Sequence, residues 1–166
     1  MHQQGHTLLG LMLTLAIASV LMLLAAPSFS GLVDRTRLEV NSERLFSALW
    51  LARTEAIARR ETVVIEAIDQ QWDNGWRIFA DHNGDGLWQQ SEPVFRQTLA
   101  LPVGYTLTAN SGIGKAVYYQ PDGRTQKPGG SLQMGRFELC TEGASQIIVI
   151  NSVGRPRLEP VSPLDC

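Results

Sequence analysis

A glycine-containing acidic segment in the middle of the chain has the spacing of a calcium-binding loop. Residues 81–86 read DHNGDG, and with the residues that follow they match the pattern D-x-[DN]-x-[DN]-G-x5-E. Residues 75–79 before it are typical of a strand and not of the helix that begins an EF-hand, so a turn rich in Asx and glycine residues is the alternative. Both alternatives stay open, and we assign no metal site from the sequence. The residues that would supply oxygens to calcium are Asp81, Asn83, Asp85, Leu87 and Glu92.

A second candidate site is a pair of arginines near the C-terminus. Residues 154–157 read GRPR, and the proline excludes a helix, so both arginines can project from an extended chain. Exposed side chains at Arg155 and Arg157 can contact DNA phosphates without sequence preference, with weak and salt-dependent affinity. The alternative is a solvated arginine pair that bridges Glu159 or Asp165. Further basic residues that could take part are Lys115, Arg124 and Arg136.

The remaining reactive residues do not form a catalytic set. Two of the three histidines, His2 and His6, lie at the N-terminus, and His82 lies in the acidic segment. Neither a Ser-His-Asp arrangement nor a zinc cluster can be assembled from them. The chain also has no phosphate-binding glycine motif followed by Lys and Ser or Thr. We therefore predict neither enzymatic activity nor a cofactor.

The only two cysteines, Cys140 and Cys166, lie in the last part of the chain. In an exported protein this pattern predicts one disulfide that holds the C-terminal tail. Two free thiols in a cytosolic protein are the alternative. The choice between them depends on whether the N-terminus directs export.

The elements that position these residues begin with an apolar N-terminal segment. Residues 7–26 contain no charged residue, and about 20 residues of α-helix cross the hydrocarbon core of a bilayer. A cleaved secretory signal peptide is the alternative. The leading residues MHQQG carry no Lys or Arg, the apolar run is long, and Pro27 would directly follow a cut after Ala26, all of which disfavour that alternative. We predict a membrane-spanning helix.

An amphipathic helix and a series of strands follow. Apolar residues on one helical stripe predict a helix that continues to about residue 60; they are Leu38, Leu45, Leu49, Ala52 and Ala56. Short β-prone runs separated by Gly, Pro, Asn and Asp then predict antiparallel strands. Their ranges are 62–68, 76–80, 94–99, 105–109, 116–119, 137–140 and 147–151. A helix followed by antiparallel sheets is an α+β fold, and the length suits one domain.

Four segments, in this order, resemble the GspH/FimT family of type IV minor pilins and type II secretion pseudopilins. Residues 5–9, GHTLL, with the apolar run behind them, are similar to the class III signal of type IV prepilins. Residues 52–60 resemble the ARSEAI-type motif of the family, and residues 75–86 resemble its GW..F.D.N.DG strand and turn. Residues 154–157 resemble the GRxR motif of FimT-type minor pilins, which is associated with DNA binding during uptake.

The resemblance implies how the chain is processed and placed. Prepilin peptidase would cut between Gly5 and His6, and Pro27 falls where pilins carry their helix-kinking proline. The mature protein would be a single-pass protein of the bacterial inner membrane with its C-terminal domain in the periplasm, and it would enter the pilus or pseudopilus on assembly. The implied regions are a prepilin leader at 1–5, a transmembrane and fibre-core helix at 6–30, and a periplasmic pilin-like α+β domain at 31–166.

Two positions depart from the pattern of pilins. Pilins usually begin the mature chain with Phe and have Glu at its fifth position, whereas this chain has His6 and Gly10. In the family that Glu is thought to pair with the N-terminal amine of a neighbouring subunit, a pairing that a low dielectric makes strong. Its absence favours a minor subunit at the tip or another unusual position of the fibre. Whether His6 is N-methylated stays open.

The function that this resemblance implies is that of a minor pilin. The chain would be a structural subunit that helps to assemble a type IV pilus, and Gly154, Arg155 and Arg157 would capture double-stranded DNA in natural transformation. A pseudopilin of type II secretion, similar to the H subunit and without DNA binding, is the alternative. The implied partners are other minor and major pilins, prepilin peptidase and the inner-membrane assembly platform.

Overall fold

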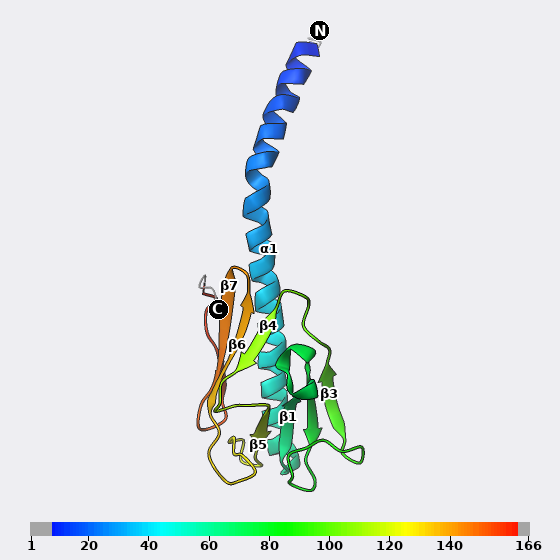
Figure 1. The fold of residues 1–166 in the computed structure, drawn as a ribbon, viewed down its shortest axis with the longest axis vertical. Coiled ribbons are helices and arrows are strands. Elements are labelled where there is room, and N and C mark those ends of the chain that lie inside the picture. Colours follow the sequence, from blue (N-terminus) through cyan, green and yellow to red (C-terminus); the bar gives the residue numbers. More distant parts are fainter. Residues whose placement is uncertain (1–7, 163–166) are drawn as a thin grey trace, which may run out of the picture. The chain divides into compact units, whose positions relative to one another are not determined.

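The computed structural model describes residues 8–162, with the side chains of residues 23–32 excepted. The chain forms two compact units, Met1–Thr36 and Arg37–Cys166. The second unit carries all the strands and is α+β as predicted (Figure 1).

The long helix α1 spans Leu8–Arg59 and belongs to both units. Its part in the second unit has the predicted apolar stripe, and the five residues of that stripe are at most 1% exposed. The helix ends where Arg60 takes a φ of +59°, because a left-handed residue directs the chain away from the helix axis. The predicted end near residue 60 is therefore confirmed.

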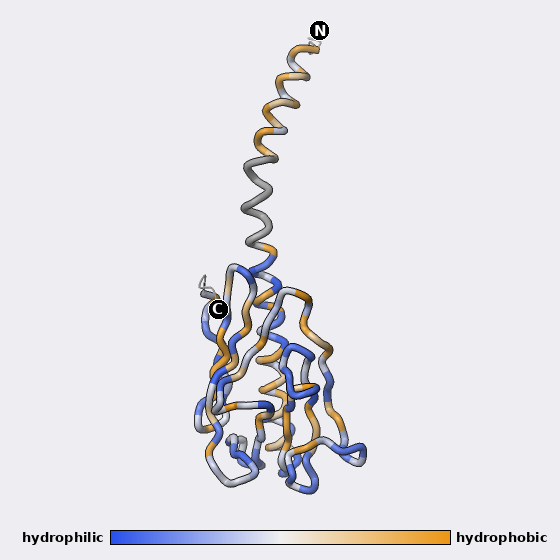
Figure 2. The backbone as a smooth tube through the Cα atoms, viewed as in Figure 1, coloured by the Kyte–Doolittle hydropathy of each residue, from blue (hydrophilic) through white to orange (hydrophobic). Residues whose placement is uncertain are grey.

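Residues 8–22, at the N-terminal end of α1, are predominantly apolar and include no charged residue. Figure 2 shows this hydrophobic stretch at the N-terminal end of the helix. Within the described part of the chain, no helix is both long and apolar enough to cross a membrane. The exposed large apolar side chains here are Leu8, Leu9, Leu11, Met12, Leu13, Leu15, Ile17, Val20, Leu21 and Met22.

Within residues 8–162, eight strands form two antiparallel sheets, here called sheet A and sheet B. Sheet A has the order β3-β2-β1-β5, and sheet B has the order β4-β6-β7-β8. The strands of sheet A are β1 Val63–Ala67, β2 Trp76–Ala80, β3 Val94–Thr98 and β5 Ala116–Tyr119. Those of sheet B are β4 Thr106–Ala109, β6 Gly135–Thr141, β7 Ala144–Ile150 and β8 Pro156–Leu158.

All seven predicted strands are present, and their observed ends differ from the predicted ends by at most three residues. The prediction missed β8, because it treated Pro156 as the centre of an irregular extended segment. Pro156 is the first residue of a strand at the edge of sheet B. At that position the absence of a backbone N–H in proline costs no hydrogen bond between strands. The prediction also missed two short 3-10 helices, η1 Ile68–Gln70 and η2 Trp72–Asn74.

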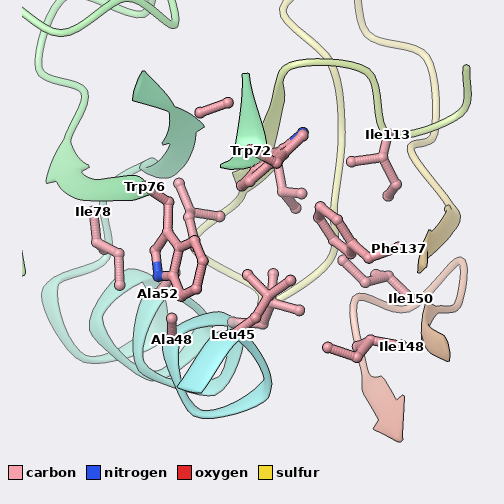
Figure 3. Packing of buried hydrophobic residues seen from close by; sticks show 14 of the residues in the cluster. Leu45, Ala48, Ala52, Trp72, Trp76, Ile78, Ile113, Phe137, Ile148 and Ile150 are labelled. Carbon is pink, nitrogen blue, oxygen red and sulfur yellow. The ribbon is translucent and has the colours of Figure 1, made fainter. Parts of the chain in front are cut away.

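One hydrophobic core joins α1 to both sheets. Figure 3 shows the indole of Trp76 in β2 beside Ala48 and Ala52, whose small side chains leave room for it against α1. Trp72 in η2 meets Phe137 in β6 edge to face, with ring centroids 4.8 Å apart. This pair joins η2, which lies in the connection between β1 and β2 of sheet A, to sheet B.

Candidate functional site

The GRPR segment lies at the turn that leads from β7 into β8. Asn151 shapes this turn, because its side-chain Oδ1 accepts hydrogen bonds from the backbone N–H of Val153 (3.2 Å) and of Arg155 (2.9 Å). The backbone N–H of Gly154 donates to the carbonyl of Asn151 at 2.9 Å. Gly154 has a φ of +76°, a conformation that glycine adopts without the strain of other residues.

The turn packs on a loop formed by residues 120–124. A Cβ on Gly154 would lie 2.2 Å from the carbonyl oxygen of Gly123. The same carbonyl accepts a hydrogen bond from Nε of Arg53 in α1 at 3.0 Å. A Cβ on Gly123 would in turn lie 2.8 Å from Cδ1 of Ile57. The loop is thus held between α1 and the turn, and Arg53 and Ile57 of the motif at residues 52–60 make this contact.

Three arginines share the solvent-facing side of sheet B at this turn. Arg155 and Arg157 are exposed and Pro156 between them is buried, as the alternation of side chains in an extended chain requires. Arg136 in β6 pairs with Val149 in β7, and Val149 pairs with Arg157 in β8. Directly paired residues face the same side of a sheet, so Arg136 and Arg157 lie in one row about 10 Å apart.

Not all of these cations are free to contact a ligand. Arg157 donates from Nη2 to Oε1 of Glu159 at 2.9 Å, and its side chain is 73% exposed. Such an exposed pair contributes little energy and is easily exchanged for another anion. The guanidinium groups of Arg136 and Arg155 have no hydrogen-bond or ion-pair partner within residues 8–162. The alternative of an arginine that bridges Glu159 therefore applies to Arg157 alone.

The other basic candidates divide between the two sheets. Arg124 is near the turn, because its Cα lies 3.1 Å from the position of a Cβ on Gly154, and its guanidinium pairs with Asp122 at 3.5 Å. Lys115 contacts the side chain of Gln70 in η1 and directly precedes β5 of sheet A. The structure thus brings together four arginines, and Lys115 is not among them.

The acidic segment is a tightly bonded turn. Asp81, which is 5% exposed, accepts the backbone N–H of Gly84 on Oδ1 at 2.8 Å and that of Gly86 on Oδ2 at 3.0 Å. Glu92, also 5% exposed, accepts the backbone N–H of His82 and of Gln89 at 3.0 Å each. Within residues 8–162 no group of three or more His, Cys, Asp or Glu side chains is placed to hold a metal.

The exposed oxygens of the segment also accept backbone hydrogen bonds. Oδ1 of Asp85 accepts the backbone N–H of Leu87 at 2.8 Å, and Oδ1 of Asn83 accepts that of Asp85 at 3.1 Å. These are bonds of an Asx turn. They direct these oxygens at the segment's own backbone, as the turn alternative predicts, and the calcium alternative stays open.

The turn also covers the outer face of sheet A. The guanidinium of Arg77 lies 3.9 Å from the ring centroid of Trp88, and its Nη1 donates to Glu66 at 3.2 Å. Burial raises the pKa of the Glu66 carboxyl above its ordinary value, while the charge of Arg77 opposes this rise. The segment therefore has a packing role that explains its ordered geometry.

We expect Asp81→Ala to lower the free energy of unfolding by about 2 kcal/mol, because two buried N–H groups lose their acceptor. Urea unfolding of the variant measures this change. The matched control is Asp122→Ala, since Asp122 makes a similar bond to the N–H of Arg124 at an exposed turn, and its effect should stay below about 0.5 kcal/mol. Equal stability of both variants would show that the buried carboxylate does not hold the turn.

Some predicted sites lie outside the described residues or cannot be located. Gly5, His6 and Cys166 fall in the part that is not described. Cys140 lies in β6 and is 6% exposed, and its disulfide to Cys166 stays a prediction. Pro27 lies within α1 among the residues whose side chains are not described, so the kink also stays a prediction.

Comparison with known proteins agrees with this fold. Residues 41–154 match the family model described as type II transport protein GspH, and residues 1–26 match the prokaryotic N-terminal methylation motif. No curated protein matches the chain.

Two solved structures show the same architecture. The type IV minor pilin FimU of Pseudomonas aeruginosa has a TM-score of 0.61 and 22% sequence identity, covering 76% of this chain and 91% of that chain. The minor pseudopilin EpsH from the type 2 secretion system of Vibrio cholerae has a TM-score of 0.54 and 15% identity, covering 74% of this chain and 96% of that chain. At these identities the likeness concerns the fold alone.

Proposed function

The chain belongs to the GspH family of type II transport proteins, and from this premise we propose that it is a minor subunit of a type IV pilus. The observation that carries the proposal is the N-terminal methylation motif at residues 1–26, which runs directly into the long helix α1. This is the arrangement of a subunit that enters a fibre through its N-terminal helix. The role is structural and involves no catalytic step.

The exposed apolar side chains of α1 between Leu8 and Met22 support this role. Large apolar side chains in water are unfavourable, at roughly 25 cal/mol for each Å² of exposed apolar surface. They require either lipid or the helices of neighbouring subunits. We propose that residues 6–30 hold the subunit in the inner membrane as a single pass before assembly, and pack with other pilin helices in the fibre afterwards.

The proposed life of the subunit has three steps. Prepilin peptidase removes residues 1–5 by cutting between Gly5 and His6. The assembly platform of the inner membrane then moves the processed subunit into the fibre, with residues 31–166 as the domain on the periplasmic side. Gly10 stands where a pairing carboxylate is usual in pilins, which favours a position at the tip over the bulk of the fibre.

Deletion of the gene in its host, followed by separate assays, tests the proposed role. We expect loss or strong reduction of surface pili and of twitching motility, with type II secretion unchanged, and restoration by the intact gene. The opposite pattern, with normal pili and defective secretion, would assign the chain to the pseudopilus and contradict the proposal.

A second candidate function is the capture of double-stranded DNA. It is favoured by the exposed arginines at the β7–β8 turn, of which Arg136 and Arg155 have no side-chain partner within the described residues. Phosphate contacts of this kind are independent of DNA sequence and weaken as salt rises. Glu138 follows Arg136 by two residues, and Glu159 follows Arg157 by two residues. These carboxylates limit the positively charged surface around Arg136 and Arg157, so the affinity for DNA is expected to be low.

The double variant Arg155→Ala/Arg157→Ala is expected to weaken DNA binding roughly ten-fold or more at low salt. The slope of log K against log salt should fall by about 2, because two phosphate contacts are removed. A gel-shift titration of the full chain in neutral detergent at several salt concentrations measures both quantities. Unchanged binding by the double variant would exclude these residues as the DNA contact.

Two further variants control for general effects of charge. Arg96→Ala removes an exposed arginine from sheet A and should leave binding unchanged. Glu159→Gln frees Arg157 from its ion pair and should strengthen binding by a few-fold, since a negative charge beside the row is lost. If Arg96→Ala weakened binding as much as the double variant, the arginines of sheet B would have no special role.

A further inference from the structure

The strand β3 is an open edge of sheet A. It pairs with β2 on one side and stands last in the strand order β3-β2-β1-β5, and Figure 1 shows it at the margin of the domain. An edge strand presents backbone N–H and C=O groups that another extended chain can pair with. Many proteins block such edges with a covering loop or helix.

A groove of about 340 Å³ runs between this edge and α1. One wall consists of Arg44 and Ser47 from α1, and the other consists of the consecutive residues 96–100. Side chains of a strand alternate between two faces, so a run of consecutive residues in the wall means that the backbone itself borders the groove. The groove is therefore shaped for an extended chain laid along β3.

The groove is positively charged. Both charged residues of its lining, Arg44 and Arg96, are arginines. The guanidinium of Arg96 has no hydrogen-bond or ion-pair partner within residues 8–162, whereas Arg44 contacts Asn41 at 3.2 Å. At the other end of the strand the guanidinium of Arg59 lies 4.4 Å from the ring centroid of Phe95, but it is paired with Glu55 at 2.7 Å, so the charge of the groove comes from Arg44 and Arg96. An acidic occupant is the one that complements these charges.

The end of the groove is held in a fixed shape. The backbone carbonyl of Asp73 in η2 accepts the N–H of Leu101, one residue beyond the lining, at 2.8 Å, and the Asp73 carboxylate accepts the N–H of Leu107 in β4. Leu99, which lines the groove, is nevertheless 81% exposed. An apolar side chain held in this way in water offers a preformed contact for a partner, and preformed contacts reduce the entropy lost on binding.

We propose that this groove binds an acidic, extended segment of a partner subunit, which adds to sheet A as a further strand beside β3. Backbone hydrogen bonds along β3 supply the attachment, Arg44 and Arg96 select for acidic residues, and Leu99 contacts an apolar side chain of the segment. This inference is independent of the proposed contact with DNA, which involves sheet B.

Synthetic peptides test the proposal on the full chain in neutral detergent. The probe is a short fluorescein-labelled peptide in which Val and Glu alternate. One comparison peptide replaces Glu by Lys, and another places a central Pro in the acidic sequence. We expect the acidic peptide to bind roughly ten-fold or more tightly than either comparison peptide, since Lys repels the arginines and Pro removes a donor that strand pairing needs.

Arg96→Glu supplies the matching change in the protein. It should reverse the preference, so that the lysine peptide binds better than the acidic one, while Arg136→Glu on sheet B should leave the preference between the peptides unchanged. Both arginines are exposed, so both variants should melt as the unmodified chain does.

Three results would overturn the proposal. The first is the absence of binding by the acidic peptide at millimolar concentration. The second is equal binding of the Pro-containing peptide, which would show a charge contact without strand pairing. The third is an acidic peptide that does not bind while anionic lipid added to the micelles protects the amides of 96–98 from hydrogen exchange, which would make this surface a lipid contact.

Discussion

Trp76→Ala is expected to lower the free energy of unfolding by about 3–5 kcal/mol, the range for truncation of a large buried aromatic side chain. The indole is 0% exposed and fills the space between β2 and the small residues Ala48 and Ala52 of α1 (Figure 3). Alanine would leave a cavity that the alanines of the helix cannot fill. Urea or thermal unfolding, followed by near-ultraviolet circular dichroism, measures the loss.

Two other substitutions locate the origin of this loss. Trp76→Phe should be less harmful, because the ring hydrocarbon is largely kept and the indole N–H has no hydrogen-bond partner within the described residues. Trp50→Ala removes a partly exposed indole from another face of α1, where it packs against Phe46, and should cost about 1 kcal/mol. If Trp76→Ala were no more harmful than Trp50→Ala, the packing of β2 on α1 would not be the main support of the fold.

Gly154→Ala is expected to lower the free energy of unfolding by about 3 kcal/mol and to displace the β7–β8 turn. Two causes act together. The backbone of Gly154 has a φ of +76°, which strains any residue with a Cβ, and the added Cβ would meet the backbone oxygen of Gly123 at 2.2 Å. That oxygen is already bound by Arg53 at 3.0 Å, so it cannot move away without loss of the bond.

Two alanine substitutions separate these causes. Gly84→Ala introduces the same strain at a φ of +75° with no atom within 4 Å of the new Cβ, and should cost about 1 kcal/mol. Gly143→Ala has neither the positive φ nor a neighbour within 4 Å and should be close to neutral. Equal effects of Gly154→Ala and Gly84→Ala would show that contact with the 120–124 loop is unimportant.

Gly154→Ala also bears on DNA capture. Arg155 and Arg157 owe their outward placement to the turn that Gly154 permits. If the arginines act as proposed, the variant should bind DNA more weakly than its loss of stability explains, measured well below its melting temperature. Unchanged DNA affinity in a folded variant would mean that the position of the turn does not matter for binding.

The calcium-loop pattern shows how one motif can fit two kinds of local structure. Ligand spacing for calcium and the spacing of an Asx turn require the same residue types, because both place carboxylate and amide oxygens around a tight bend. The two differ in where the oxygens point. Only the fold shows that Asp81 and Glu92 accept four backbone N–H groups of the segment itself.

The amino-acid sequence by itself determined the helix stripe from Leu38 to Ala56, the strands up to Ile150 and the α+β class. Each depends on which neighbouring residues are buried, and burial follows a period of 3.6 or 2 along the chain. Such local patterns can be recognised without knowing which other element the helix or strand packs against. The sequence did not predict the strand β8, because a proline such as Pro156 disfavours a strand unless that strand is known to lie at the edge of a sheet.

Only the tertiary structure decided which distant residues form surfaces. The row of Arg136 and Arg157 depends on the register of β6, β7 and β8, and the groove of Arg44 and Arg96 depends on how β3 lies along α1. A displacement of its strand by one residue would turn Arg96, Arg136 or Arg157 to the other face of its sheet. Register is set by burial in the shared core, which no local segment of the chain encodes.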